Sequence, residues 1–169
     1  MSKSQSPQVA VLMGSDSDWD TMQSCVKMLD QFDINSEVLI TSAHRTPDQT
    51  AEYARTASDR GLEVIIAAAG MAAHLAGVIA AHTTLPVIGV PIASGSLQGI
   101  DALLSTVQMP PGVPVATVGI GSAGAKNAAL LAVQILARKD KSLTQKLDQY
   151  KSDQAQSVQN KNTRLQKEL

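Results

Sequence analysis

Short apolar runs recur along the chain, and each of them ends at a glycine or a proline. Strands that are apolar on both faces are typical of a parallel sheet that helices cover on both sides. We therefore expect buried parallel strands at residues 9–13, 64–69, 87–90 and 115–118. Residues 36–40 are a further strand candidate.

Segments with helical periodicity separate these runs. A first helix is indicated by apolar residues at three- and four-residue steps, which are Trp19, Met22, Val26 and Leu29. Ser17 is the predicted N-cap of this helix. Pro47 suits the first turn of a second helix, with Thr46 as its N-cap and an end near residue 60. The remaining predicted helices cover about residues 72–81, 100–108 and 123–137.

The order of the elements is strand then helix, repeated about five times and followed by one more helix. This order predicts an α/β protein with an open, doubly wound parallel sheet in three layers. The repeats are too few and too short for an eight-fold barrel. A length of 169 residues allows one domain, with its core at about residues 9–138 and a tail at about residues 140–169.

The tail is polar, rich in glutamine and lysine, and carries few apolar residues. It is either a solvated helix or an arm that packs on a neighbouring subunit. The predicted helix before it has few strongly polar residues, which are Lys126, Asn127 and Gln134. A helix that is apolar nearly all round needs cover on both sides. The sheet can cover one side, and another subunit is a candidate for the other.

Composition narrows the range of functions. A net charge of -1 gives no general electrostatic reason to expect nucleic acid or an anionic membrane as partner. Four aromatic residues in the whole sequence offer little stacking surface for a flavin or a single-stranded nucleic acid. The single cysteine, Cys25, allows no internal disulfide and is interpreted as a core residue. No Cys/His cluster has the spacing of a zinc site, so no metal is expected.

The sequence gives no sign of export or of a membrane anchor. Residues 1–8 are polar and lack the apolar core of a signal peptide. The longest apolar stretches are interrupted by Gly, His or Pro before they could span a bilayer. We therefore expect a cytoplasmic protein.

Polar side chains follow three of the predicted strands, at residues 14–18, 42–47 and 70–75. Ligands of open α/β sheets bind beyond the carboxyl ends of the strands. If these strands are near neighbours, the three loops converge on one cleft. A Gly-Ser turn at residues 14–15 can hold a phosphate, or can simply cap a helix, and Asp18 suits ribose hydroxyls as an acceptor.

The second loop carries the most informative pair, His44 and Arg45. A histidine can exchange a proton near neutral pH, and an arginine can clamp a phosphate. A purely structural role for His44 remains open from the residues alone. His74 lies among small residues, which permit either close approach to a ligand or close packing of a helix on the sheet. His82 is assigned no role.

Taken together, these segments resemble one family, the bacterial N5-carboxyaminoimidazole ribonucleotide mutases. The resemblance rests on five motifs in order, which are Gly14-Ser15-x-Ser17-Asp18-Trp19, Ser42-Ala43-His44-Arg45-Thr46-Pro47, Ala72-Ala73-His74-Leu75, Val107-Gln108-Met109-Pro110 and Asn127-Ala128-Ala129-Leu130-Leu131-Ala132. It implies a flavodoxin-like three-layer α/β/α sandwich with an extra C-terminal helix. It also implies a homo-octamer in which the tail contacts neighbouring subunits.

The resemblance also implies a reaction in purine biosynthesis, with no metal, nucleotide cofactor or biotin. The family converts N5-carboxyaminoimidazole ribonucleotide into its C4-carboxylated isomer by losing CO2 and recapturing it. His44 would be the catalytic acid and base. The positions that match ribose and phosphate binding are Ser15, Asp18, Ser42 and Arg45. The positions that match the loop around the base and the migrating carboxylate are Gly70, Ala72, His74 and Leu75.

Two residues depart from the family pattern Gly-Gly-Ala-Ala-His-Leu-Pro-Gly in the third loop. Met71 stands where glycine is expected, and Ala76 where proline is expected. Three alternative functions stay open at this point. They are an aminoimidazole ribonucleotide carboxylase that uses CO2 directly, a non-catalytic flavodoxin-like binding or electron-transfer module, and an assembly protein that has lost turnover.

Overall fold

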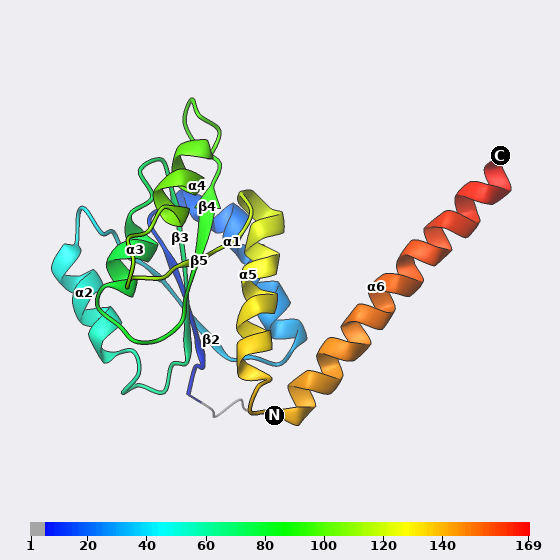
Figure 1. Cartoon of the computed structure of the whole chain (residues 1–169), viewed down its shortest axis with the longest axis horizontal. Coiled ribbons are helices and arrows are strands. Elements are labelled where there is room, and N and C mark those ends of the chain that lie inside the picture. The colour runs from blue at the N-terminus through cyan, green and yellow to red at the C-terminus, as the bar shows by residue number, and fades with distance from the viewer. Residues whose placement is uncertain (1–5) are drawn as a thin grey trace. The chain divides into compact units, whose positions relative to one another are not determined.

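A computed structural model describes residues 6–169; residues 1–5, part of the predicted signal-free N-terminus, lie outside the described residues. Its centre is a five-stranded parallel sheet in the order β2-β1-β3-β4-β5 (Figure 1). The strands are β1 (Val9–Met13), β2 (Ser36–Ile40), β3 (Val64–Gly70), β4 (Val87–Ile92) and β5 (Ala116–Thr117). All five predicted strands are therefore present.

Helices lie on both faces of this sheet. They are α1 (Trp19–Gln31), α2 (Pro47–Thr56), α3 (Leu75–Ala80), α4 (Ile100–Val107) and α5 (Gly121–Leu136), with a 3-10 turn η1 (Asp16–Asp18) before α1. Figure 1 shows α2, α3 and α4 on one side of the sheet, and α1 with α5 up to residue 133 on the other. The predicted flavodoxin-like three-layer α/β/α fold is confirmed.

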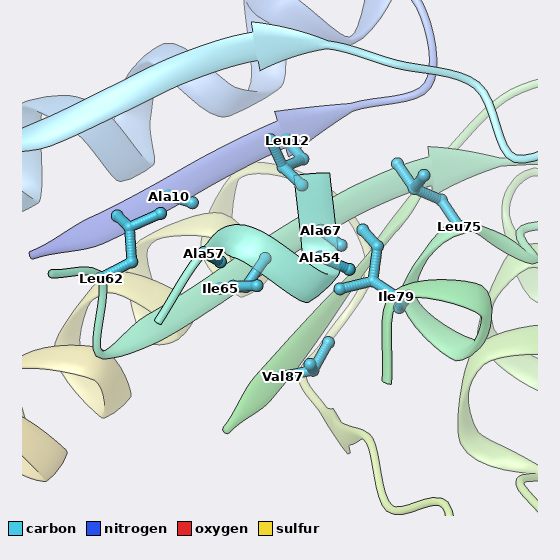
Figure 2. Close-up of a cluster of buried hydrophobic side chains, with 11 residues drawn as sticks. Ala10, Leu12, Ala54, Ala57, Leu62, Ile65, Ala67, Leu75, Ile79 and Val87 are labelled. Carbon is cyan, nitrogen blue, oxygen red and sulfur yellow. The ribbon is translucent and has the colours of Figure 1, made fainter. Parts of the chain in front are cut away.

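The core on the α2 and α3 side is built from small and branched aliphatic side chains (Figure 2). The strands contribute Ala10, Leu12, Ile65, Ala67 and Val87, and the helices contribute Ala54, Leu75, Ala76 and Ile79. Burial of each leucine or isoleucine contributes roughly 1.5–3 kcal/mol. Alanine at the facing positions lets the helices approach the sheet closely.

On the other side of the sheet, Cys25 of α1 is fully buried, as expected for a core residue.

Helix starts differ from the predictions at two loops. Ser17 is not the N-cap of α1, because the 3-10 turn η1 comes first and Ser15 caps that turn. The third helix begins at Leu75 rather than at residue 72. Its N-cap residue is His74, and Met71, just before the predicted start, has a left-handed φ of 56°. Thr46 is the N-cap residue of α2, as predicted.

Two further differences concern element ends and burial. The second helix ends at Thr56, not near residue 60, and a tight turn carries the chain to Gly61, whose φ is 90°. The buried strand predicted at residues 115–118 is wrong in length and burial: β5 covers only Ala116, which is exposed, and Thr117, which is half-buried, at one edge of the sheet. The strand β2 lies at the other edge. Its last three residues, Val38, Leu39 and Ile40, are exposed.

The chain divides into two compact units, Met1–Val133 and Gln134–Leu169. The second unit contains α6 (Lys141–Glu168), a continuous helix whose N-cap carboxylate on Asp140 accepts a hydrogen bond from the Ser142 amide at 2.8 Å. Its side chains are exposed from residue 151 onward. The extra C-terminal helix is thus confirmed, whereas its use in subunit contacts, and the assignment of the whole chain to one domain, stay predictions. No helix in residues 6–169 is long and apolar enough to cross a membrane.

Candidate active site

The three polar loops meet at one edge of the sheet, as predicted. The strands before them, β1, β2 and β3, are adjacent, and Met13 pairs with Ile40 on one side and Ala68 on the other. A cavity of about 520 Å³ lies beyond these strand ends. All nine predicted site residues line it, namely Ser15, Asp18, Ser42, His44, Arg45, Gly70, Ala72, His74 and Leu75.

The loop after β1 turns an acidic side chain into the cavity wall. The Ser15 amide donates to the Asp18 carboxylate at 3.1 Å, and the Ser15 hydroxyl accepts from the Ser17 amide at 3.3 Å. Ser15 and Asp18 also form a capping box, in which each side chain accepts from the other residue's amide, and this fixes the turn. Burial raises the pKa of the Asp18 carboxyl, and this effect outweighs its backbone hydrogen bonds to residues 14 and 15, which lower it. Asp18 is therefore a fixed, mostly buried acceptor.

The loop after β2 is closed by threonine hydroxyls. The Thr46 hydroxyl accepts from the Ser42 amide at 3.0 Å and donates to the Ser42 carbonyl at 3.1 Å. The Thr50 hydroxyl donates to the Thr46 carbonyl at 3.0 Å and is 2.7 Å from the Thr41 hydroxyl. Thr50 is fully buried. These bonds hold the backbone of the segment that carries His44, and we refer to residues 41–47 as the His44 loop.

Sequence reasoning did not find this hydroxyl network. Thr46 was placed correctly as the N-cap residue, but its side chain closes the loop and makes no capping bond to the helix. The signal available in the sequence is the spacing of the three threonines at positions 41, 46 and 50. This spacing indicates a hydrogen-bond network only once it is known that the loop turns back toward α2 and brings the three hydroxyls together.

Two histidines from different loops form a pair in the cavity. His44 Nε2 lies 2.7 Å from His74 Nδ1, and the rings meet edge to face at 4.9 Å between centroids. One of the two nitrogens must carry the shared proton, because a ring nitrogen either donates or accepts. Both side chains are exposed to the cavity. The pair is therefore able to pass a proton to and from a bound molecule.

Arg45 connects the His44 loop to the loop after β1. Its guanidinium donates to the Gly14 carbonyl at 3.3 Å, and its amide donates to the Ser42 hydroxyl at 3.2 Å. A second hollow of about 490 Å³ adjoins the first, and Ser15, Ser42 and Arg45 line both. A cation beside two hydroxyls is a good environment for a phosphate.

The loop after β3, residues 70–74, is held by close packing, and we refer to it as the Met71 loop. A Cβ atom at Gly70 would overlap the Ser94 hydroxyl, so any side chain there requires that hydroxyl to move. Ser94 follows β4 and lines the cavity, and sequence reasoning missed it. The sequence feature that could have identified Ser94 is its position just beyond the end of a predicted strand. Of the two departures from the family pattern, Met71 lies at the cavity and Ala76 is buried in the core below α3.

The chemistry that these groups offer is proton exchange, anion binding and hydroxyl recognition. The histidine pair can exchange protons, and Arg45 can bind an anion. Asp18 and the serines can recognise hydroxyl groups. Among residues 6–169, no group of three or more His, Cys, Asp or Glu side chains is placed to hold a metal ion.

Comparison with known proteins identifies the family of this chain. The model of the AIR carboxylase family matches residues 8–157, which is most of the chain. The chain belongs to the AIR carboxylase family. Two relatives in this family are named N5-carboxyaminoimidazole ribonucleotide mutase. The Pyrococcus abyssi protein is 58% identical over 87% of this chain and 83% of its own length. The Bacillus subtilis protein is 57% identical over 90% of this chain and 94% of its own length.

A solved structure supports the same family assignment. The crystal structure of Treponema denticola PurE matches with a TM-score of 0.84 and 30% sequence identity, over 94% of this chain and 98% of that chain. The agreement over nearly the whole length of both chains shows that the fold described above is the AIR carboxylase family's fold.

Proposed function

We propose that this protein is an N5-carboxyaminoimidazole ribonucleotide mutase, an isomerase of de novo purine biosynthesis. It moves a carboxyl group from the exocyclic N5 of the substrate to C4 of the imidazole ring. Eight relatives that are 52–58% identical carry this name. The observation that carries the proposal is the pair of His44 and His74, 2.7 Å apart in a cavity that also contains Arg45.

His44 acts as both acid and base. It donates a proton to N5 while the N5–carboxyl bond breaks, and the electron pair of that bond stays on the nitrogen. CO2 and aminoimidazole ribonucleotide result. The C4 electron pair then attacks CO2, and His44 removes the C4 proton. The proton count is unchanged over the cycle, so one group can serve both steps.

His74 positions the His44 ring. A hydrogen bond from one ring nitrogen fixes which face and which nitrogen of the partner ring are available. The 2.7 Å contact leaves Nδ1 of His44 as the nitrogen that faces away from His74. The backbone bonds of the His44 loop fix the other end of the side chain. Ring orientation is therefore set from two sides.

The ribonucleotide is bound by groups from all three loops. Arg45 and the hydroxyls of Ser15 and Ser42 receive the phosphate, at the junction of the two hollows. Asp18 accepts hydrogen bonds from the ribose hydroxyls. The base and the carboxylate lie along the third loop, against Gly70, Ala72, His74 and Leu75. The reaction as written needs no metal, biotin or nucleotide cofactor.

A second candidate is an aminoimidazole ribonucleotide carboxylase that takes CO2 directly. The description of the family model as AIR carboxylase favours keeping it. The two are separated by supplying each substrate to the purified protein and measuring product formation. The mutase predicts efficient turnover of the carboxyamino substrate. If the protein turns over only aminoimidazole ribonucleotide with bicarbonate, and not the carboxyamino substrate, the mutase proposal is overturned.

The same proposal includes a cytoplasmic homo-octamer. One apolar face supports assembly, because exposed residues on and beside α4 recur on one side of the helix at positions Leu97, Ile100, Leu104 and Val107. Apolar patches of this kind mark interaction sites. Light scattering coupled to size exclusion should give an octamer for the natural chain and smaller species for Leu104→Lys. Glu52→Lys, at an exposed polar position of α2, is the control.

A further inference from the structure

Met71 combines an unfavourable backbone with a place at the cavity. In the described part of the chain, three residues other than glycine have a left-handed backbone, which are Asp33, Met71 and Gln98. Of these, Met71 is the one that lines the cavity. A left-handed conformation disfavours every side chain, because Cβ crowds the following carbonyl oxygen. Residues held this way cluster at functional sites, so the side chain of Met71 calls for a functional explanation.

Met71 is a solvent-exposed residue of the cavity wall. It is 60% exposed although it lines the cavity wall. Its Cγ is 3.9 Å from the point where a Cβ atom would lie on Gly95, a residue of the loop after β4. Gly95 has no side chain to obstruct it. The Met71 side chain is therefore exposed to solvent and has open space toward Gly95.

We propose that Met71 is an apolar cover that retains CO2 in the cavity between the two half-reactions. This inference rests on the proposed function. The N5–carboxyl bond breaks before the C4–carboxyl bond forms, so a free CO2 molecule exists in between. If it escapes, aminoimidazole ribonucleotide is released instead of the isomer. Closing an active site against water prevents such a loss.

The chemistry of methionine suits this role. CO2 is small and has no net dipole, so an apolar surface contains it without binding it tightly. Methionine is unbranched, with three rotatable bonds, and adapts to irregular surfaces. It can therefore move aside for the ribonucleotide and fold back over it. Glycine at this position, as in the family pattern, offers no cover of its own.

The test measures CO2 escape directly. The purified full-length protein is given unlabelled carboxyamino substrate in buffer containing isotopically labelled bicarbonate, with carbonic anhydrase to equilibrate CO2. Mass spectrometry of the product then reports the fraction of carboxyl groups that exchanged with solution. Met71→Gly and Met71→Ala should both raise the labelled fraction several-fold, and Met71→Leu should restore most of the retention.

Two variants of Met71 separate the side chain from the backbone. Alanine removes the cover and keeps the left-handed strain, whereas glycine removes both. An increase in label for glycine alone would overturn the proposal, because backbone mobility would then explain it. An unchanged labelled fraction in both variants, or lost turnover without added label, would overturn it as well.

Asp33→Gly is the matched control. It makes the same change at a left-handed residue in the turn before β2, away from the cavity. It should leave the labelled fraction unchanged, and an equal rise there would count against Met71 as the cover.

The Met71→Gly variant should also be more stable than the natural protein, because glycine relieves the strain of the left-handed backbone. Its Tm should rise by about 2–4 °C. If the natural protein fails to convert the substrate at all, the proposed function has failed, and not this inference alone.

Discussion

The His44 loop and the Met71 loop line the same cavity and are stabilised in opposite ways. In the His44 loop, the hydroxyls of Thr46 and Thr50 bond to the backbone at residues 42 and 46, at 3.0–3.1 Å. In the Met71 loop, the fit of Gly70 against Ser94 and one left-handed residue set the path of the chain. One loop is fixed by directional bonds and the other by steric fit.

This difference matches the tasks that the two loops have in the proposed reaction. A proton can be transferred only over hydrogen-bond distance, so the group that transfers it must be held in place. A cover over a small apolar molecule needs a mobile side chain on a fixed backbone. Substitutions in either loop test this difference, and the expected effects decrease from Gly70→Ala through Arg45→Ala and Thr46→Val to Asp18→Asn.

The steric fit of the Met71 loop is broken by Gly70→Ala. The new Cβ would overlap the Ser94 hydroxyl and lie 3.3 Å from the Ser94 Cβ and 3.4 Å from the Ile92 carbonyl oxygen, so Ser94 must rotate or the loop must shift. We expect a loss of about 1–3 kcal/mol in the free energy of unfolding, typical of overpacking, and a large loss of activity. Urea denaturation measures the first. Gly119→Ala, where a Cβ meets open space, is the control, and adding Ser94→Gly should recover stability.

The binding task of the His44 loop is tested by Arg45→Ala. Loss of a hydrogen-bonded cation should raise KM by about 10–100-fold, since charged hydrogen bonds contribute roughly 1.5–3 kcal/mol. The value of kcat should change little. Steady-state kinetics over a range of substrate concentrations separate the two constants. A pure effect on kcat would contradict the assignment of Arg45 to the phosphate.

The directional bonds of the His44 loop are removed by Thr46→Val, which keeps the shape and deletes the hydroxyl. The Ser42 amide and carbonyl both lose a partner. We expect kcat to fall about tenfold, because a small displacement of a catalytic group has a large effect on rate. Thr46→Ser, which keeps the hydroxyl, should restore most of kcat. Equal kcat for the valine and serine variants would show that the hydroxyl bonds do not position His44.

The smallest effect concerns Asp18, in the loop between the other two. Burial raises the pKa of its carboxyl above the ordinary 3.8, so the folded protein holds this proton more tightly than the unfolded chain. The stability that this group contributes is therefore present at low pH and lost as pH rises through the raised pKa. Asp18→Asn should gain stability over the natural protein as pH rises above 3.8. Urea denaturation across pH measures it, and a shrinking gain would contradict the sign.

Sequence reasoning predicted the site because parallel strands bring their carboxyl ends to one edge. The glycines and prolines that end the apolar runs therefore mark where the loops begin; His44 is a candidate from its place in one of them, and the resemblance assigns it a reaction. The exposure of β5, where the residues predict a buried strand, depends on the strand order, which places β5 at an edge of the sheet. An alternation of apolar and polar residues does not say which strand lies at the edge.

The missed features depend on contacts between distant segments. Ser94 belongs to the site because β4 lies next to β3, and the Thr46 hydroxyl closes a loop because the chain turns back at residues 42–46. The left-handed state of Met71 contradicts the preference of its own side chain.

Turnover by the His44→Asn variant tests whether His44 transfers the proton in both half-reactions. The variant and the natural protein are given the carboxyamino substrate, and product formation and substrate affinity are measured in parallel. Asparagine keeps some polarity but cannot exchange a proton near neutral pH. We expect near-normal affinity, with turnover reduced by about 10²–10⁴-fold. Turnover close to that of the natural protein would contradict it.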